Sequence, residues 1–151
     1  MDTVCIPDTL LRAVGPQPSR PLVAEEQFLI CRPQDRLARR RSVTLAEVAD
    51  LPLVLPSREH GLRFAVEDRI NSIGSRANIQ MEIDSIVGLR RFVERGKVYT
   101  ILPRGELEED VVVGRLAAVR IVKPTIHRIL FVAWHTRNGR CRRRCEQSWS
   151  S

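Results

Sequence analysis

The sequence predicts an α/β protein, because short apolar runs typical of strands alternate with segments of helical periodicity. This alternation runs from about residue 26 to residue 103 and predicts a largely parallel sheet with helices on its faces. Two further observations support the class. Hydrophobic residues make up 43% of the 151 residues, which is enough to bury a core, and capping signals mark the helix starts. The length suits one domain, or one domain and a fragment.

The first predicted elements are a strand, a short helix and a second strand. The strand lies around Phe28–Cys31 and ends before Pro33. In VTLAEVADLP, Thr44 and Glu47 form a capping box, in which each side chain satisfies the other residue's free backbone N–H. Pro52 ends this helix. The segment LPLVLP then has the length and the flanks of a buried strand.

Two longer helices and four strands follow. GLRFAVEDRINSIG predicts a helix closed by Gly74 in the left-handed conformation, and DSIVGLRRFVERG predicts a helix capped by Asp84 or Ser85. NIQMEI between them predicts a strand with one buried face, and VYTILP, LAAVRIV and RILFVAW predict three more strands. The residues expected to face inward are Leu62, Val66, Ile70 and Ile73, then Ile79, Met81 and Ile83, then Ile86, Leu89 and Val93.

The stretch LVLPSREHGLR, residues 53–63, places hydrogen-bonding side chains directly after an apolar strand. Ligands of parallel α/β sheets bind where strands end and helices begin, because a helix N-terminus offers free N–H groups and partial positive charge. Ser57 suits a helix cap or a ligand contact, since both use free N–H groups. Arg58 and Arg63 would bind an anionic ligand through charge-assisted hydrogen bonds, or lie on a solvated surface. His60 would sense pH or ligand, or form an ordinary surface hydrogen bond.

The net charge of +7 is concentrated in a short tail. Residues 136–151 hold five arginines and one glutamate, or +4, which leaves +3 for the first 135 residues. A basic tail binds phosphate without sequence specificity, so non-specific nucleic-acid binding through this tail is an alternative function. No helix-turn-helix pattern is present, so specific DNA readout by this chain alone is not expected.

Other classes of function are disfavoured by the motifs that are missing. Ser57 and His60 would suggest a hydrolase, but the Gly-x-Ser-x-Gly elbow and a credible acid partner are absent, so we expect no enzyme and no cofactor. Cys141-x3-Cys145 has metal-like spacing without a second pair nearby, so we expect no metal site. No stretch approaches a membrane span and no secretory signal is visible, which predicts a cytoplasmic protein.

Three stretches in order, LPLVLPSREHGLR, EIDSIVGLRRFVERGKVYTILP and GRLAAVRIVKPTIHRILFVAW, resemble the C-terminal effector-binding domain of LysR-type transcriptional regulators. The resemblance is strongest to the branch that contains nitrogen assimilation control proteins, and it covers roughly residues 20–134. It implies a fold like that of type 2 periplasmic binding proteins, mainly the second subdomain. EEQFLIC and RILFVAW would be the two strands that cross between the subdomains.

The resemblance also implies a site and a function. Pro56, Ser57 and Arg58 match the turn through which the second subdomain contacts the effector, and His60 and Arg63 lie close enough to assist. The implied partner is a small-molecule effector. The implied role is a regulatory domain that controls transcription through an effector-dependent conformational shift. Intact relatives are homo-oligomers and bind DNA through a helix-turn-helix domain that this chain does not contain.

This resemblance divides the chain into three parts. Residues 1–24 would be the remnant of the first effector subdomain, residues 25–134 the effector-binding subdomain with its crossing strands, and residues 135–151 a basic irregular tail. The composition changes abruptly after Trp134. We therefore expect a truncated or frameshifted gene product, and translation of the neighbouring DNA in all frames would test this expectation.

Overall fold

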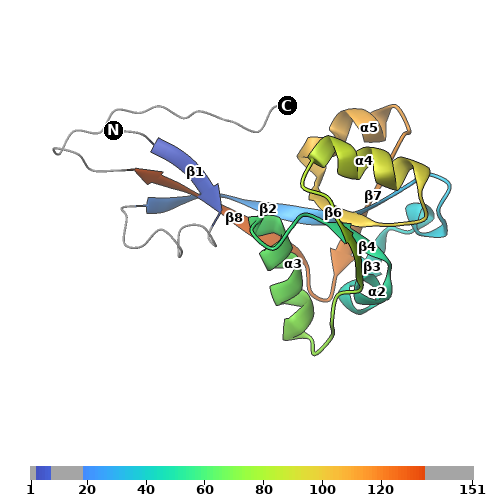
Figure 1. Cartoon of the computed structure of the whole chain (residues 1–151), viewed down its shortest axis with the longest axis horizontal. Helices are drawn as coiled ribbons and strands as arrows, with labels where there is room; N and C mark the ends of the chain where they lie inside the picture. The colour runs from blue at the N-terminus through green and yellow to red at the C-terminus, as the bar shows by residue number, and fades with distance from the viewer. Residues whose placement is uncertain (1–2, 8–18, 135–151) are drawn as a thin grey trace. The chain divides into compact units, whose positions relative to one another are not determined.

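The computed structural model describes residues 3–7 and 19–134 of the chain. The predicted strands and helices appear in it in the predicted order, with further short elements that the sequence analysis did not predict (Figure 1). The strands are β1 Thr3–Pro7, β2 Ser19–Cys31, β3 Ser42–Thr44, β4 Leu53–Leu55, β5 Ile79–Glu82, β6 Thr100–Pro103, β7 Ala117–Val122 and β8 Ile126–Trp134. The helices are η1 Arg36–Arg39, α2 Leu45–Asp50, α3 Gly61–Ser72, α4 Ile86–Arg95, η2 Arg104–Leu107 and α5 Glu108–Val112. The predicted basic tail, residues 135–151, lies outside the described residues.

The strands form a mixed sheet and a separate parallel pair. The larger sheet has six strands in the order β1-β8-β2-β7-β3, with β6 also paired to β2. Strand β2 runs antiparallel to both β6 and β7, β1 runs antiparallel to β8, and β3 runs parallel to β7. The prediction of a largely parallel sheet is therefore wrong for this sheet, because the long strand β2 enters it against the direction of its neighbours. Strands β4 and β5 form the parallel pair.

The chain divides into two compact units, and the candidate site lies in the second. One unit comprises Met1–Glu25 and Arg128–Ser151, and the other comprises Glu26–His127. Within the first unit, the buried Arg128 donates a hydrogen bond to the carboxylate of Glu25 at 2.8 Å. None of the helices in the described part of the chain has the length and hydrophobicity needed to span a bilayer.

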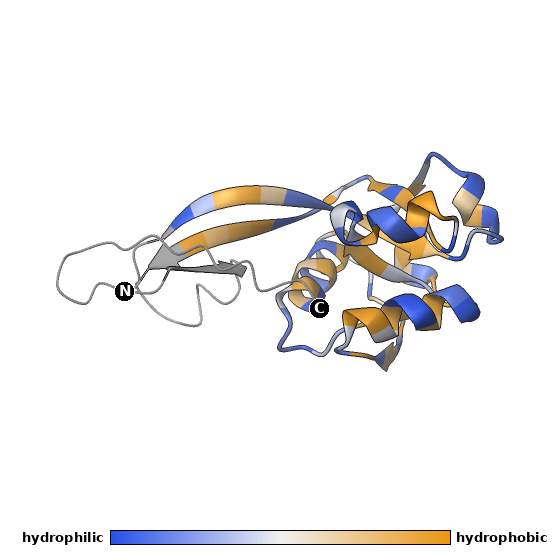
Figure 2. Cartoon of the chain, turned by 90° about the horizontal axis from the view of Figure 1, so that it is seen from above, coloured by the Kyte–Doolittle hydropathy of each residue, from blue (hydrophilic) through white to orange (hydrophobic). Residues whose placement is uncertain are grey.

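The core of the second unit contains most of the residues expected to face inward. Figure 1 shows α4 and α5 on one side of β6, and α2 and α3 on the other. Hydrophobic residues run along the strands and alternate with polar ones along the helices (Figure 2). The predicted inner residues with at most 1% exposure are Leu62, Val66, Ile70, Leu89 and Val93.

Strand β5 does not bury one face as predicted. Met81 is 46% exposed, and Gln80 and Glu82 beside it are exposed as well. Among the described strands β5 pairs only with β4, so it forms the edge of the parallel pair. An edge strand has core on one flank only, and this leaves its alternating side chains at the surface.

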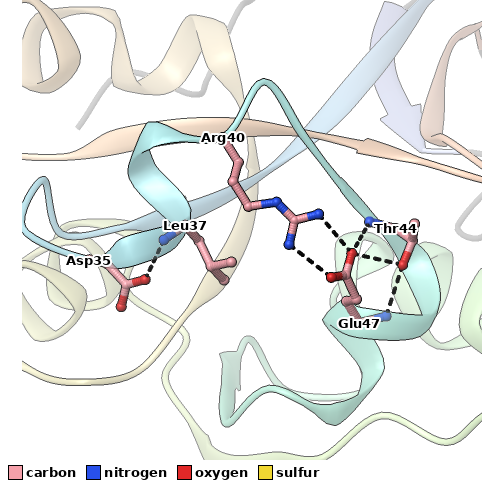
Figure 3. Close-up of polar contacts among 5 residues, drawn as sticks. All are labelled: Asp35, Leu37, Arg40, Thr44 and Glu47. Atoms are coloured by element: carbon pink, nitrogen blue, oxygen red, sulfur yellow. Dashed lines mark hydrogen bonds and ion pairs between the residues drawn. The ribbon is translucent and has the colours of Figure 1, made fainter.

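The predicted capping box at the start of α2 is confirmed (Figure 3). The Glu47 N–H donates to Thr44 Oγ1 at 3.2 Å, and the Thr44 N–H donates to Glu47 Oε2 at 2.8 Å. Arg40 donates to both oxygens of the same carboxylate, at 2.8 and 3.2 Å. The hydrogen bonds from Arg40, followed by those from Thr44, lower the pKa of Glu47 to about 2. This helix start is thus closed by residues that are close in sequence.

The ends of α3 and α4 decide two further predictions. Gly74 has φ 75, which confirms the left-handed closing residue after α3. Of the two residues proposed to cap α4, Ser85 does so, because its Oγ accepts a hydrogen bond from the Gly88 N–H at 3.1 Å. Asp84 is therefore not used as the cap of its own helix.

Candidate functional site

The predicted site emerges from the core at the end of β4. All three residues of β4 have no exposed surface, and Pro56 after them is still buried. Exposure begins at Ser57 and is greatest at Arg58 and Glu59. We call residues 56–60 the β4–α3 turn. Its polar groups reach the surface on the end of a rigid, fully buried strand, as a ligand-contacting segment requires.

His60, and not Ser57, caps α3. The imidazole Nδ1 of His60 accepts a hydrogen bond from the Leu62 N–H at 3.2 Å. The His60 N–H donates to the Ser57 carbonyl at 3.0 Å and so closes the turn. Because Nδ1 acts as an acceptor here, a neutral His60 carries its proton on Nε2. The helix-cap alternative for Ser57 is thus taken by His60, and the Ser57 N–H points to a different partner.

That partner is Asp84, a residue that our sequence analysis did not place in the site. Asp84 Oδ1 accepts a hydrogen bond from the Ser57 N–H at 2.8 Å. The parallel register pairs Leu55 with Glu82, so Ser57 and Asp84 each follow a paired strand end by two residues. The only signal in the sequence was an acidic residue after the neighbouring strand, and its use required knowledge of the pairing.

The environment of Asp84 favours its carboxylate form. Hydrogen bonds from the backbone and then the side chain of Ser57 lower the pKa of Asp84, and the charge of His60 lowers it further. An acid partner near Ser57 is therefore present, contrary to the sequence expectation. However, Asp84 accepts from the Ser57 backbone, and the Nδ1 of His60 is occupied by the Leu62 N–H. This arrangement differs from a catalytic triad, in which the acid orients the imidazole base.

Arg63 is held by protein groups. Its side chain is 4% exposed, and Nη1 donates to the Pro56 carbonyl at 3.0 Å and to Glu82 Oε1 at 2.9 Å. Its Nε lies 3.1 Å from Glu67 Oε1. Arg63 therefore links the β4–α3 turn, β5 and α3, and two of its three guanidinium nitrogens already have partners.

Arg58 and Arg63 share an open groove of about 680 Å³ along α3 and β5, which we call the α3 groove. Ser57 and His60 are not among its lining residues, so the predicted residues fall into two places, the turn and the groove. Arg58 makes no hydrogen bond or ion pair with the described residues. The lining residues are Arg58, Arg63, Glu67, Asn71, Arg76, Ala77, Ile79, Gln80, Met81 and Glu82.

A second groove, of about 520 Å³, lies beside η1 and α2. Its lining includes Arg40 and Glu47, which bind each other through two hydrogen bonds. The other charged lining residues are Arg36 and Asp50, so the charges of the lining sum to zero and the groove offers an anion little net attraction.

The structure shows no metal-binding cluster in residues 3–7 and 19–134, where no three His, Cys, Asp or Glu side chains gather around one point. Cys31 is buried, and its burial, with a smaller effect of Asp35, raises the pKa of the thiol to about 12. It is therefore protonated at neutral pH and is not a ready metal ligand. Cys141 and Cys145 lie outside the described residues.

Comparison with protein families and curated proteins gives a consistent result. Residues 11–142 match the family described as LysR substrate binding domain. The chain is 35% identical to the HTH-type transcriptional regulator BbuR of Bordetella bronchiseptica over 99 residues. This match covers 66% of this chain and 30% of that protein. The chain is 27% identical over 113 residues to the regulator YybE of Bacillus subtilis, which covers 75% and 38%. The chain spans well under half the length of these relatives.

Solved structures of regulators share the fold. The reduced form of OxyR superposes with a TM-score of 0.76 at 20% identity, over 92% of this chain and 64% of that one. The regulatory domain of Synechocystis CcmR in complex with 2-PG gives 0.74 at 17%, over 93% and 65%. The effector binding domain of QuiR in complex with shikimate gives 0.67 at 19%, over 77% and 54%. The predicted fold class, α/β and like type 2 periplasmic binding proteins, is confirmed.

Two finer predictions gain no support from these relatives. The resemblance to the nitrogen assimilation control branch stays a prediction. The alternative function, non-specific nucleic-acid binding, depends on residues 136–151, which lie outside the described part of the chain, and the relatives do not favour it.

Proposed function

The chain belongs to the LysR substrate-binding domain family, and we propose that its β4–α3 turn is the effector contact through which a transcriptional regulator senses a small molecule. The observation that carries this proposal is the position of the turn. It follows a fully buried parallel strand and precedes the N-terminus of α3, which carries partial positive charge. Ser57, Arg58 and His60 are the residues of this turn that would contact the effector.

The effector is a small organic anion. Arg58 supports this choice, because it is exposed and has no ion-pair partner among the described residues. An unpaired guanidinium next to a helix N-terminus favours a carboxylate or phosphate. The structures of QuiR with shikimate and CcmR with 2-PG show that domains of this fold hold small ligands. Pro56 and Arg63 act indirectly, because Arg63 bonds the Pro56 carbonyl and so fixes the turn.

From the family we also propose the role of the whole regulator. Effector binding would shift a conformational equilibrium of a homo-oligomeric regulator, which binds DNA through a separate helix-turn-helix domain. Residues 25–134 would supply the second effector subdomain with its crossing strands, and residues 1–24 the end of the first. Such a regulator acts on DNA, so we place it in the cytoplasm.

A ligand screen tests the effector site. The 151-residue chain is heated in the presence of single organic acids, phosphorylated acids and neutral analogues. A ligand that binds only the native state must raise the melting temperature. We expect an acid to do so in the wild type and to lose most of its effect in Arg58→Ala. Arg69→Ala removes an exposed arginine of α3 that has no side-chain partner in the described residues, and it should leave the shift unchanged. Equal loss in both variants would mean that only total charge matters.

A further inference from the structure

The proposed effector site already contains a carboxylate that belongs to the protein. Asp84 Oδ1 lies 2.8 Å from the Ser57 nitrogen and accepts its hydrogen. The Ser57 N–H is the first backbone donor after the buried end of β4, because Pro56 has none. An effector carboxylate that approached this donor would meet Asp84 in the position it needs.

The bond between Asp84 and Ser57 is not needed to join the two loops. The Ile83 N–H donates to the Leu55 carbonyl at 3.0 Å, and the β4–β5 pairing extends to Leu55 and Glu82. The cap of α4 is Ser85, so Asp84 has no capping duty either. Its carboxylate is exposed and can swing into solvent at little cost in buried contacts. The contact is therefore exchangeable.

We propose that Asp84 is an internal competitor of the effector: its carboxylate occupies the Ser57 N–H in the unliganded protein and leaves when an anionic effector takes that donor. This inference rests on the proposed function of the β4–α3 turn. It names Asp84 as a residue that sets both the affinity and the charge preference of the site.

The competition has two consequences. Two ionised carboxylates cannot share one N–H donor, because the like charges repel and only one can accept a linear hydrogen bond. An anionic effector must therefore displace Asp84, whereas a neutral ligand that contacts other groups need not. Displacement also places the Asp84 carboxylate in solvent directly before Ser85, the cap of α4, while the Ile83 to Leu55 hydrogen bond keeps the two loops joined.

The test uses malonate as a simple dicarboxylate probe and malonamide as its neutral analogue. The 151-residue chain is labelled with ¹⁵N, and the Ser57 amide resonance is followed during titration of the wild type, Asp84→Asn and Asp84→Ala. Asp68→Asn is the matched control, because it removes one exposed carboxylate of α3 that has no partner in the described residues. All four proteins must show the dispersed spectrum of a folded chain.

We expect malonate to bind both Asp84 variants about tenfold more tightly than the wild type, as removal of a competing charged hydrogen bond implies. Asp68→Asn should keep the wild-type affinity, and malonamide should bind all four proteins equally. If malonate shifts Ser57 with one affinity in all four proteins, the competition is refuted and the proposed anion site remains. Weaker binding to the Asp84 variants also refutes it, because Asp84 would then help to hold the ligand. If malonate shifts Ser57 in none of them, the proposed site and the inference both fail.

Discussion

Two strand-to-helix junctions of the second unit satisfy their free N–H groups in different ways. At the start of α2, Thr44 and Glu47 bond each other across three residues, and Arg40 neutralises the carboxylate. At the start of α3, His60 supplies a local cap, but the Ser57 N–H is bonded by Asp84, which lies 27 residues further along the chain.

The difference separates a closed junction from an exchangeable one. In the α2 junction, the N–H groups of Thr44 and Glu47 both have acceptors within the same short segment, so a ligand would gain either donor only by opening the capping box. In the α3 junction, the acceptor belongs to another loop and can leave while both loops stay in place. Both junctions present polar residues at the start of a helix, and the sequence does not show from which segment their acceptors come. Only the origin of the acceptor distinguishes a structural cap from a candidate binding site.

The largest effect is expected from Arg63→Met, which removes the side chain that links the β4–α3 turn to β5 and α3. The buried guanidinium donates hydrogen bonds to the Pro56 carbonyl and Glu82 and forms an ion pair with Glu67, and its loss leaves that carbonyl unsatisfied. Glu67 and Glu82 are partly exposed and regain water, so we expect a loss of about 2 kcal/mol, below the usual cost of breaking a fully buried pair. Urea unfolding measures the change. Arg69→Met, an exposed change on the same helix, should cost less than about 0.5 kcal/mol. An equal loss of stability in both variants would contradict the linking role of Arg63.

A smaller effect is expected from Thr44→Ala at the closed junction. The substitution removes the side-chain acceptor of the Glu47 N–H, and a lost N-cap costs about 1 kcal/mol. The same urea titration detects this loss. Because the α2 junction is closed by its own capping box, any ligand found in the melting screen should bind Thr44→Ala with wild-type affinity. A clear fall in that affinity would show that the closed junction also contacts ligand.

His60→Asn should change stability less than Thr44→Ala does. Asn is among the preferred N-cap residues and can accept the Leu62 N–H in place of the imidazole, so we expect a change within about 0.5 kcal/mol in either direction. Ligand affinity should nevertheless change, because the imidazole is part of the proposed effector contact. Unchanged affinity together with unchanged stability would restrict His60 to a capping role.

The smallest effect is expected in how the free energy of unfolding falls at acidic pH. The folded-state pKa values of Glu47, about 2, and of Asp84 both lie below the ordinary values of 4.5 and 3.8. A lowered folded-state pKa stabilises the fold above the ordinary pKa, and this contribution is lost as pH falls towards the folded-state value. The substitution Arg40→Ala should raise the pKa of Glu47 towards 4.5 and leave the pKa of Asp84 unchanged, and a carboxyl ¹³C titration measures both values. A parallel shift of Asp84 would mean that the two junctions are coupled.

The sequence by itself determined the local elements of this protein. The Thr44–Glu47 box, the buried stripes of α3 and α4 and the left-handed Gly74 depend on groups three or four residues apart, and such spacings are visible in a sequence. The order of its motifs also identified the family. Tertiary structure alone decided the antiparallel entry of β2, the exposure of Met81, the linking role of the buried Arg63 and the meeting of Asp84 with Ser57. These features depend on which strands pair and in what register, and strand pairing joins residues whose separation along the chain carries no periodic signal.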